Sequence, residues 1–213
     1  MKYKWIAVPL ISVWINPVAT AETIEVEYKG FYSHVKKLTG EDTQALQFAF
    51  GFQHNTENRL CELSAAKIVT QKQSIDLVIT AENRFTVPSE RALNMAGAKL
   101  EIETTDKANQ CDMSVQLETK PEYLKYYYSH DELQFIYDQY AAFFNEMGSF
   151  LSFMMPHVDG LTFHFADHEM DRELKDAPAI VNGILQLPGS WLGEQEALAL
   201  PVKPLRITAR THR

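Results

Sequence analysis

A stretch between positions 157 and 173 holds the side chains best suited to metal chemistry. It contains three of the chain's seven histidines and several carboxylates, and imidazole and carboxylate groups are common ligands of zinc and related metals. If residues 160–166 form a strand, His164 lies on its polar face, and Asp167 and His168 follow its end. These three residues are the candidate metal site, where a bound metal could activate water for hydrolysis. The simpler alternative is a solvated loop of an acidic protein, with no cofactor.

Other signatures of catalysis are missing from the sequence. We find no Gly-x-Ser-x-Gly turn of a serine hydrolase, no His-Glu-x-x-His helix and no phosphate-binding Gly-Lys-Ser/Thr loop. The pattern therefore names no catalytic residue. It favours a non-enzymatic protein, and the metal-dependent hydrolase remains the alternative.

The chain has two cysteines, Cys61 and Cys111, each at the start of a run with β-like composition. Two strands that start from the same end of a sheet would bring the two sulfurs together. In an oxidising compartment such a pair forms a disulfide, which we expect here. The alternatives are two buried thiols or a redox-active pair, and the latter is disfavoured because no Cys-x-x-Cys motif occurs.

The first 21 residues have the pattern of a cleavable export signal. Lys2 and Lys4 precede a short apolar run, and Ala19 and Ala21 supply the small residues that signal peptidase accommodates. The apolar run is shorter than the roughly 20 residues that span a bilayer, so we expect no stable membrane anchor after cleavage. We predict cleavage after Ala21, a mature chain of residues 22–213 that forms a single domain, and a periplasmic location.

The charge of the chain bears on its partners. The full sequence has 28 acidic and 20 basic residues, a formal charge of −8, and loss of the two lysines in the export signal lowers it to −10. A negatively charged surface repels nucleic acid. We therefore expect no nucleic-acid partner, and we consider another envelope protein instead.

The region after Pro121 favours one long amphipathic helix over about 130–147, and an extension to 155 is a second option. Ser129 and Glu132 have the spacing of a capping box. The apolar stripe comprises Leu133, Ile136, Tyr137, Tyr140 and Phe144. The extension is apolar on nearly all sides. If the sheet covers one side only, an exposed interaction patch results; if other segments cover the rest, the same residues are core. The patch residues are Phe150, Phe153 and Met154.

Four tyrosines precede this helix, at positions 123, 126, 127 and 128. Aromatic rings of this kind can stack on sugar rings. Alternatively, they cover the start of the helix and pack against the sheet.

Short segments before Pro121 alternate polar and apolar residues, with turn signals between them, as antiparallel strands do. The clearest is 46–52, which places three phenylalanines on one face. Further strands are expected at 160–166 and near the C-terminus, whereas the charged segment 167–183 is expected to be a loop. The predicted fold is α+β: an antiparallel sheet or sandwich with the helix packed on it.

Several segments resemble a known family. They are the Cys61 segment, Arg84-Phe-Thr-Val-Pro88, Gln110-Cys-Asp-Met-Ser-Val-Gln116, Gly160-Leu-Thr-Phe163 and Leu187-Pro-Gly-Ser-Trp191. In these the chain resembles an uncharacterised family of secreted Gram-negative proteins that carry a domain of unknown function. The resemblance covers most of the mature chain and implies a periplasmic location. It implies no activity, ligand or functional residue.

Three functions remain open at this point. The first is a non-enzymatic periplasmic binding or envelope-accessory protein. The second is the metal-dependent hydrolase centred on His164, Asp167 and His168. The third is a carrier of a small apolar ligand, which needs an apolar cavity of roughly 300 Å³ between helix and sheet.

Overall fold

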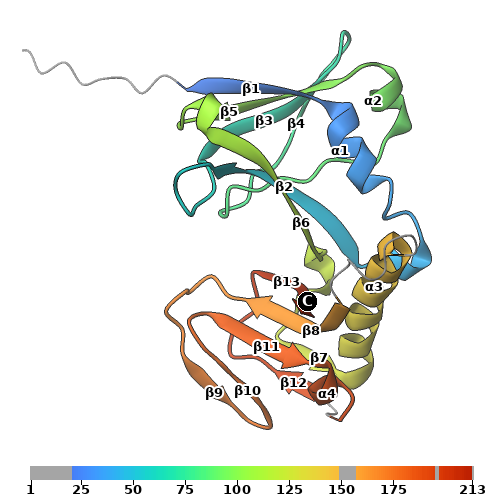
Figure 1. Ribbon diagram of the computed structural model, residues 1–213, viewed down its shortest axis with the longest axis vertical. Coiled ribbons are helices and arrows are strands. Elements are labelled where there is room, and N and C mark those ends of the chain that lie inside the picture. The colour runs from blue at the N-terminus through green and yellow to red at the C-terminus, as the bar shows by residue number, and fades with distance from the viewer. Residues whose placement is uncertain (1–20, 149–156, 195–196, 213) are drawn as a thin grey trace, which may run out of the picture.

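The computed structural model describes residues 21–148, 157–194 and 197–212. The chain combines helices with antiparallel sheets, which confirms the α+β class. Figure 1 shows two lobes, an N-terminal lobe in blue to green and a C-terminal lobe in yellow to red. In the described residues the strands form several small sheets in place of the single sheet or sandwich that the alternation predicted.

The N-terminal lobe contains a four-stranded antiparallel sheet and a separate two-stranded ribbon. The sheet has the order β1 (Glu22–Glu27), β5 (Lys99–Thr104), β3 (Leu63–Val69) and β4 (Ser74–Asp76). The ribbon pairs β2 (Leu46–His54) with β6 (Cys111–Thr119) along their whole length. The helical elements are α1 (Tyr28–Val35), η1 (Glu41–Thr43), α2 (Arg91–Met95), η2 (Ala108–Gln110) and η3 (Pro121–Tyr123).

The C-terminal lobe is built around a three-stranded antiparallel sheet and one helix. The sheet has the order β11 (Ile184–Pro188), β8 (His157–His164) and β13 (Arg206–His212). Two further pairs are β7 (Tyr127–Ser129) with β12 (Ala197–Ala199), and β9 (Arg172–Leu174) with β10 (Ala177–Ile180). The helices are α3 (His130–Gly148) and α4 (Gly189–Leu192). The pair β9–β10 lies in the segment that was expected to be a loop, so that expectation was wrong.

Helix α3 begins where its sequence predicts. Ser129 Oγ accepts a hydrogen bond from the Glu132 amide at 3.3 Å, and Glu132 Oε2 accepts one from the Ser129 amide at 3.0 Å. This is the capping box. Within the described residues α3 ends at Gly148; its extension to 155 and the patch of Phe150, Phe153 and Met154 lie outside them. No described helix has the length and apolar character needed to cross a membrane.

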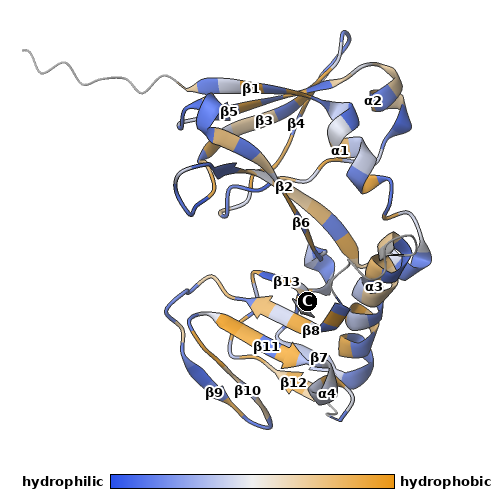
Figure 2. Ribbon diagram, in the orientation of Figure 1, coloured by the Kyte–Doolittle hydropathy of each residue, from blue (hydrophilic) through white to orange (hydrophobic). Residues whose placement is uncertain are grey.

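Aromatic residues form much of the core and join the two lobes. Phe31, Phe50 and Phe85 are fully buried, and the ring centroids of Phe31 and Phe50 are 4.9 Å apart. Phe48 of β2 meets Phe143 of α3 edge to face at 5.8 Å. The buried apolar residues of both lobes belong to one cluster, and Figure 2 shows that β2, β8 and β11 carry much of the hydrophobic sequence.

Tyr140 of α3 links three elements inside this core. Its side chain is fully buried. The hydroxyl donates a hydrogen bond to the Ile207 carbonyl of β13 at 2.7 Å and lies 3.1 Å from Thr119 Oγ1 of β6. Helix α3 therefore holds the last strand of the C-terminal lobe against the end of the β2–β6 ribbon.

Candidate functional site

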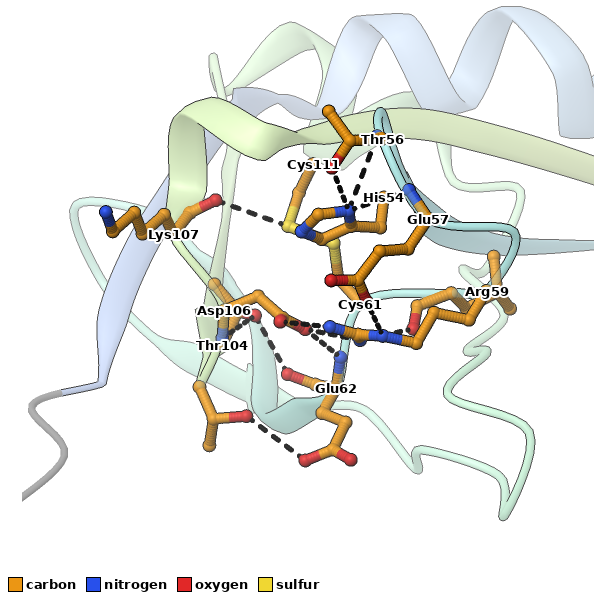
Figure 3. A network of polar contacts seen from close by, with 12 residues as sticks. His54, Thr56, Glu57, Arg59, Cys61, Glu62, Thr104, Asp106, Lys107 and Cys111 are labelled. Atoms are coloured by element: carbon orange, nitrogen blue, oxygen red, sulfur yellow. Dashed lines mark hydrogen bonds and ion pairs between the residues drawn. A yellow bond between two sulfur atoms is a disulfide. The ribbon is translucent and has the colours of Figure 1, made fainter.

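The two cysteines meet within a polar network at one end of the β2–β6 ribbon (Figure 3). Cys61 and Cys111 are joined by a disulfide across 50 residues of sequence, with their Cα atoms 6.2 Å apart. This confirms the predicted bond. Cys61 is fully buried just before β3, and Cys111 is the first residue of β6. The disulfide thus ties the connection between β2 and β3 to the start of β6.

An ion pair beside the disulfide joins the same two segments. Arg59 Nη1 and Nη2 donate to the two carboxylate oxygens of Asp106 at 2.9 and 2.7 Å, and Asp106 Oδ2 also accepts the Glu62 amide at 2.8 Å. The hydrogen bonds from Arg59 are the main cause that lowers the pKa of Asp106 to about 2. Because this carboxylate stays ionised at neutral pH, the pairing persists under ordinary conditions.

The region around the disulfide has a structural role. Cys61, Asp106 and Cys111 are the one group of three potential metal ligands, among the described residues, whose ligand atoms lie within 4.8 Å of one another. The two sulfurs are bonded to each other, so neither offers the thiolate that a metal requires. The arrangement stabilises the fold at this end of the ribbon.

His164 of the predicted metal site lies on the polar face of β8. Its Nε2 is 3.1 Å from Thr208 Oγ1, and its Nδ1 is 3.4 Å from Arg206 Nη2. Burial lowers the pKa of this imidazole, and the charge of His168 lowers it further, so the ring is neutral at pH 7. A guanidinium beside Nδ1 opposes a metal cation at that nitrogen.

Asp167 and His168 lie in the exposed turn that follows β8. Asp167 Oδ1 accepts a hydrogen bond from the Glu169 amide at 3.0 Å. Gly183, between β10 and β11, packs against this turn with φ of +70°, and a Cβ there would approach the Asp167 carbonyl oxygen to 2.3 Å. Within the described chain, His164, Asp167 and His168 do not form a group of ligand atoms within 4.8 Å of one another.

A pocket of about 210 Å³ lies at the start of α3. Tyr128 and Ile136 form its floor, because both are almost completely buried, and their side chains are largely apolar. One wall is the pair Tyr123 and Phe135, whose ring centroids are 5.7 Å apart with planes tilted by 35°. The remaining lining residues are charged: Lys125, Asp131 and Glu132. The pocket therefore combines an aromatic wall with a charged rim, and its volume suits one ring or the end of one side chain.

The charges and hydroxyls of the pocket are largely fixed by local contacts. Lys125 Nζ donates to Glu132 Oε1, which is the main cause that lowers the pKa of Glu132, and the hydrogen bond from Ser129 lowers it further. The Tyr128 hydroxyl accepts the Lys125 amide at 2.7 Å. Burial raises the pKa of Tyr128 to about 12. Asp131 is exposed and makes no hydrogen bond or ion pair with any residue that the structure describes.

The sequence analysis singled out some residues of this pocket but did not predict the pocket itself. The four tyrosines were noted as an aromatic cluster, and Tyr123 and Tyr128 do line the pocket, whereas Tyr126 and Tyr127 are exposed. The missed partner was Phe135. Its spacing of four residues from Asp131 places both side chains on one side of the first helical turns, which is the signal that could have found it.

The chain belongs to the family described as protein of unknown function (DUF2987), which matches residues 20–165. The matched region contains both cysteines and every residue that lines the pocket, and it ends one residue beyond β8. No curated protein and no solved structure matches the chain.

Proposed function

We propose that the protein is exported to the periplasm of a Gram-negative bacterium and acts there as a non-enzymatic binding or envelope-accessory protein. Its binding site is the pocket of η3, β7 and α3. The observation that carries the proposal is the pocket itself, a concave apolar floor with an aromatic wall and a few charged groups at the rim. Pockets of this composition are typical of ligand sites.

Two observations support the periplasmic location. The first strand begins at Glu22, so cleavage after Ala21 would leave every described element intact. The carboxylate of Glu22 accepts the Ala108 amide at 2.8 Å, which holds the start of this strand against η2. The disulfide is a bond that persists in oxidising compartments and is rare in the cytosol.

The ionisation of the pocket supports binding over catalysis. A general acid or base works best when its pKa lies near the working pH. Burial moves the pKa of Tyr128 up to about 12, and the contact with Lys125 moves the pKa of Glu132 down. Both groups therefore keep one protonation state at neutral pH. Such groups can orient a ligand, but they are poorly placed to exchange protons with it.

Site-specific photo-crosslinking in living cells tests this function. A photoreactive amino acid replaces Tyr126, which is 61% exposed and next to the pocket residue Lys125, and a control variant carries it at Met95, which is 74% exposed in the other lobe. We expect a defined crosslinked product from position 126, in the periplasmic fraction, that position 95 does not give. Equal labelling from both positions, or protein confined to the cytoplasm, would contradict the proposal.

A further inference from the structure

The rim of the α3 pocket has one carboxylate, that of Asp131, with no ion-pair or hydrogen-bond partner in the part of the chain that the structure describes. Glu132 is occupied, since Lys125 and the Ser129 amide both donate to it. Asp131 has no such partner among the described residues and is exposed to solvent. The capping box already satisfies amides at the start of α3, so Asp131 is not needed as the cap. Its carboxylate is available as a hydrogen-bond acceptor for a ligand.

The aromatic wall of the pocket suits the same kind of ligand. The faces of aromatic rings carry partial negative charge and attract ammonium and guanidinium groups within about 6 Å of the ring centre. Tyr123 and Phe135, whose ring centroids are 5.7 Å apart, line the same pocket as the Asp131 and Glu132 carboxylates. A cavity of about 210 Å³ is below the roughly 300 Å³ at which ligand pockets for small molecules usually begin. The end of a single long side chain fits such a space better than an extended glycan.

The charge of the whole chain acts in the same direction. The full sequence carries −8, and the predicted mature chain, which lacks two lysines, carries −10. A field of this sign raises the association rate of cationic partners and disfavours anionic ones. Two exposed tyrosines, Tyr126 and Tyr127, stand beside the pocket in sequence at 61% and 58% exposure. Tyrosine is enriched at the centre of protein interfaces.

We propose that the pocket binds the end of a lysine or arginine side chain from a basic segment of a partner protein. The cation lies between the Asp131 carboxylate and the rings of Tyr123 and Phe135, while the exposed tyrosines contact the flanking residues of the segment. This inference rests on the proposed function and names the chemistry of its partner.

The test measures peptide affinity by fluorescence anisotropy with the full mature protein. The probe is a labelled decapeptide of alternating lysine and glycine, and its glutamate counterpart is the reference. Asp131→Asn removes the free carboxylate, and we expect affinity for the lysine peptide to fall about three- to fivefold. Phe135→Leu keeps an apolar side chain without the ring, and we expect a fall of about two- to fivefold. Asp138→Asn is the matched control, because Asp138 is an exposed carboxylate of the same helix that does not line the pocket. We expect it to bind like the wild type.

Several outcomes would overturn the inference. Equal weakening by Asp131→Asn and Asp138→Asn would mean that overall charge, and not the pocket, attracts the peptide. Absence of lysine-peptide binding up to millimolar concentration would also contradict the inference. Binding of tri-N-acetylglucosamine that Phe135→Leu abolishes, without binding of the peptide, would assign the pocket to glycans and leave the proposed binding function standing. That function itself fails if the crosslink from position 126 is also absent.

Discussion

Replacement of both cysteines with alanine, Cys61→Ala together with Cys111→Ala, removes the covalent link across 50 residues. In the chain-entropy treatment, a loop of this length stabilises the folded state by about 4 kcal/mol, because the bond restricts the unfolded chain. Whole domains are stable by only about 5–15 kcal/mol, so the loss is a large share of the total. For a chain of this size it corresponds to a fall of roughly 8–16 °C in Tm.

Urea unfolding measures this loss directly. We expect the double variant and the reduced wild type to unfold at similar, lower urea concentrations than the oxidised protein. We also expect both to show a larger dependence of the unfolding free energy on urea, because their unfolded chains expose more surface. If the oxidised protein and the double variant differ by less than about 1 kcal/mol, then the ion pair of Arg59 and Asp106 with its hydrogen bonds holds this end of the ribbon alone, and the reasoning is wrong.

Three further predictions concern the export signal, the core and the acid response. Protein isolated from the periplasm should begin at Glu22 by N-terminal sequencing, whereas a retained residue Ala21 or any earlier start would refute the cleavage site. Tyr140→Phe should cost about 1–3 kcal/mol in urea unfolding, because the Ile207 carbonyl loses its buried donor; an unchanged midpoint would show that this hydroxyl adds nothing. The pKa of Asp106 is lowered to about 2 in the folded protein from an ordinary value of 3.8, so its stabilisation is complete above about pH 4 and is lost as the pH falls towards 2. Asp106→Asn should therefore be less stable than the wild type at pH 7, and the gap should narrow between pH 4 and pH 2.5; a gap that stays constant would contradict the assignment.

Much of the local structure follows from short-range patterns in the sequence. The alternation at 46–52 predicts β2, whose phenylalanines are buried as expected. Ser129 and Glu132 fix the start of α3 because both partners of the capping box lie within one turn. The disulfide was predictable because the chain offers only two cysteines. In each case the information lies in residue types and their spacing.

The sequence was less informative where distant segments decide the outcome. Gln139 lies outside the apolar stripe predicted for the helix, yet it is only 5% exposed. Its Oε1 accepts the Ala45 amide at 2.9 Å, 94 residues away, and its Nε2 donates to the Glu41 carbonyl at 3.3 Å. Asp176 adopts a positive φ of 58° between β9 and β10, so a charged stretch without alternation still forms a hairpin. No short-range pattern specifies such tertiary contacts.

The same limit applies to the candidate site. Tyr123 and Phe135 are 12 residues apart in sequence, and they meet only because η3 and β7 turn the chain back onto the first turns of α3. The histidines gave a stronger signal in the sequence. In the structure, however, Thr208 and Arg206 of β13 lie beside the nitrogens of His164. The residues near His164 in the sequence do not predict these contacts.

The central claim is that the pocket at the start of α3 is where the protein binds its partner. Hydrogen–deuterium exchange of the mature protein, alone and in its own periplasmic extract, tests this claim most directly. We expect slower deuterium uptake in residues 121–129 in the extract, no change in residues 91–98 of the other lobe, and a smaller effect in Asp131→Asn. Unchanged uptake at 121–129, or protection that appears elsewhere and persists in Asp131→Asn, would contradict the claim.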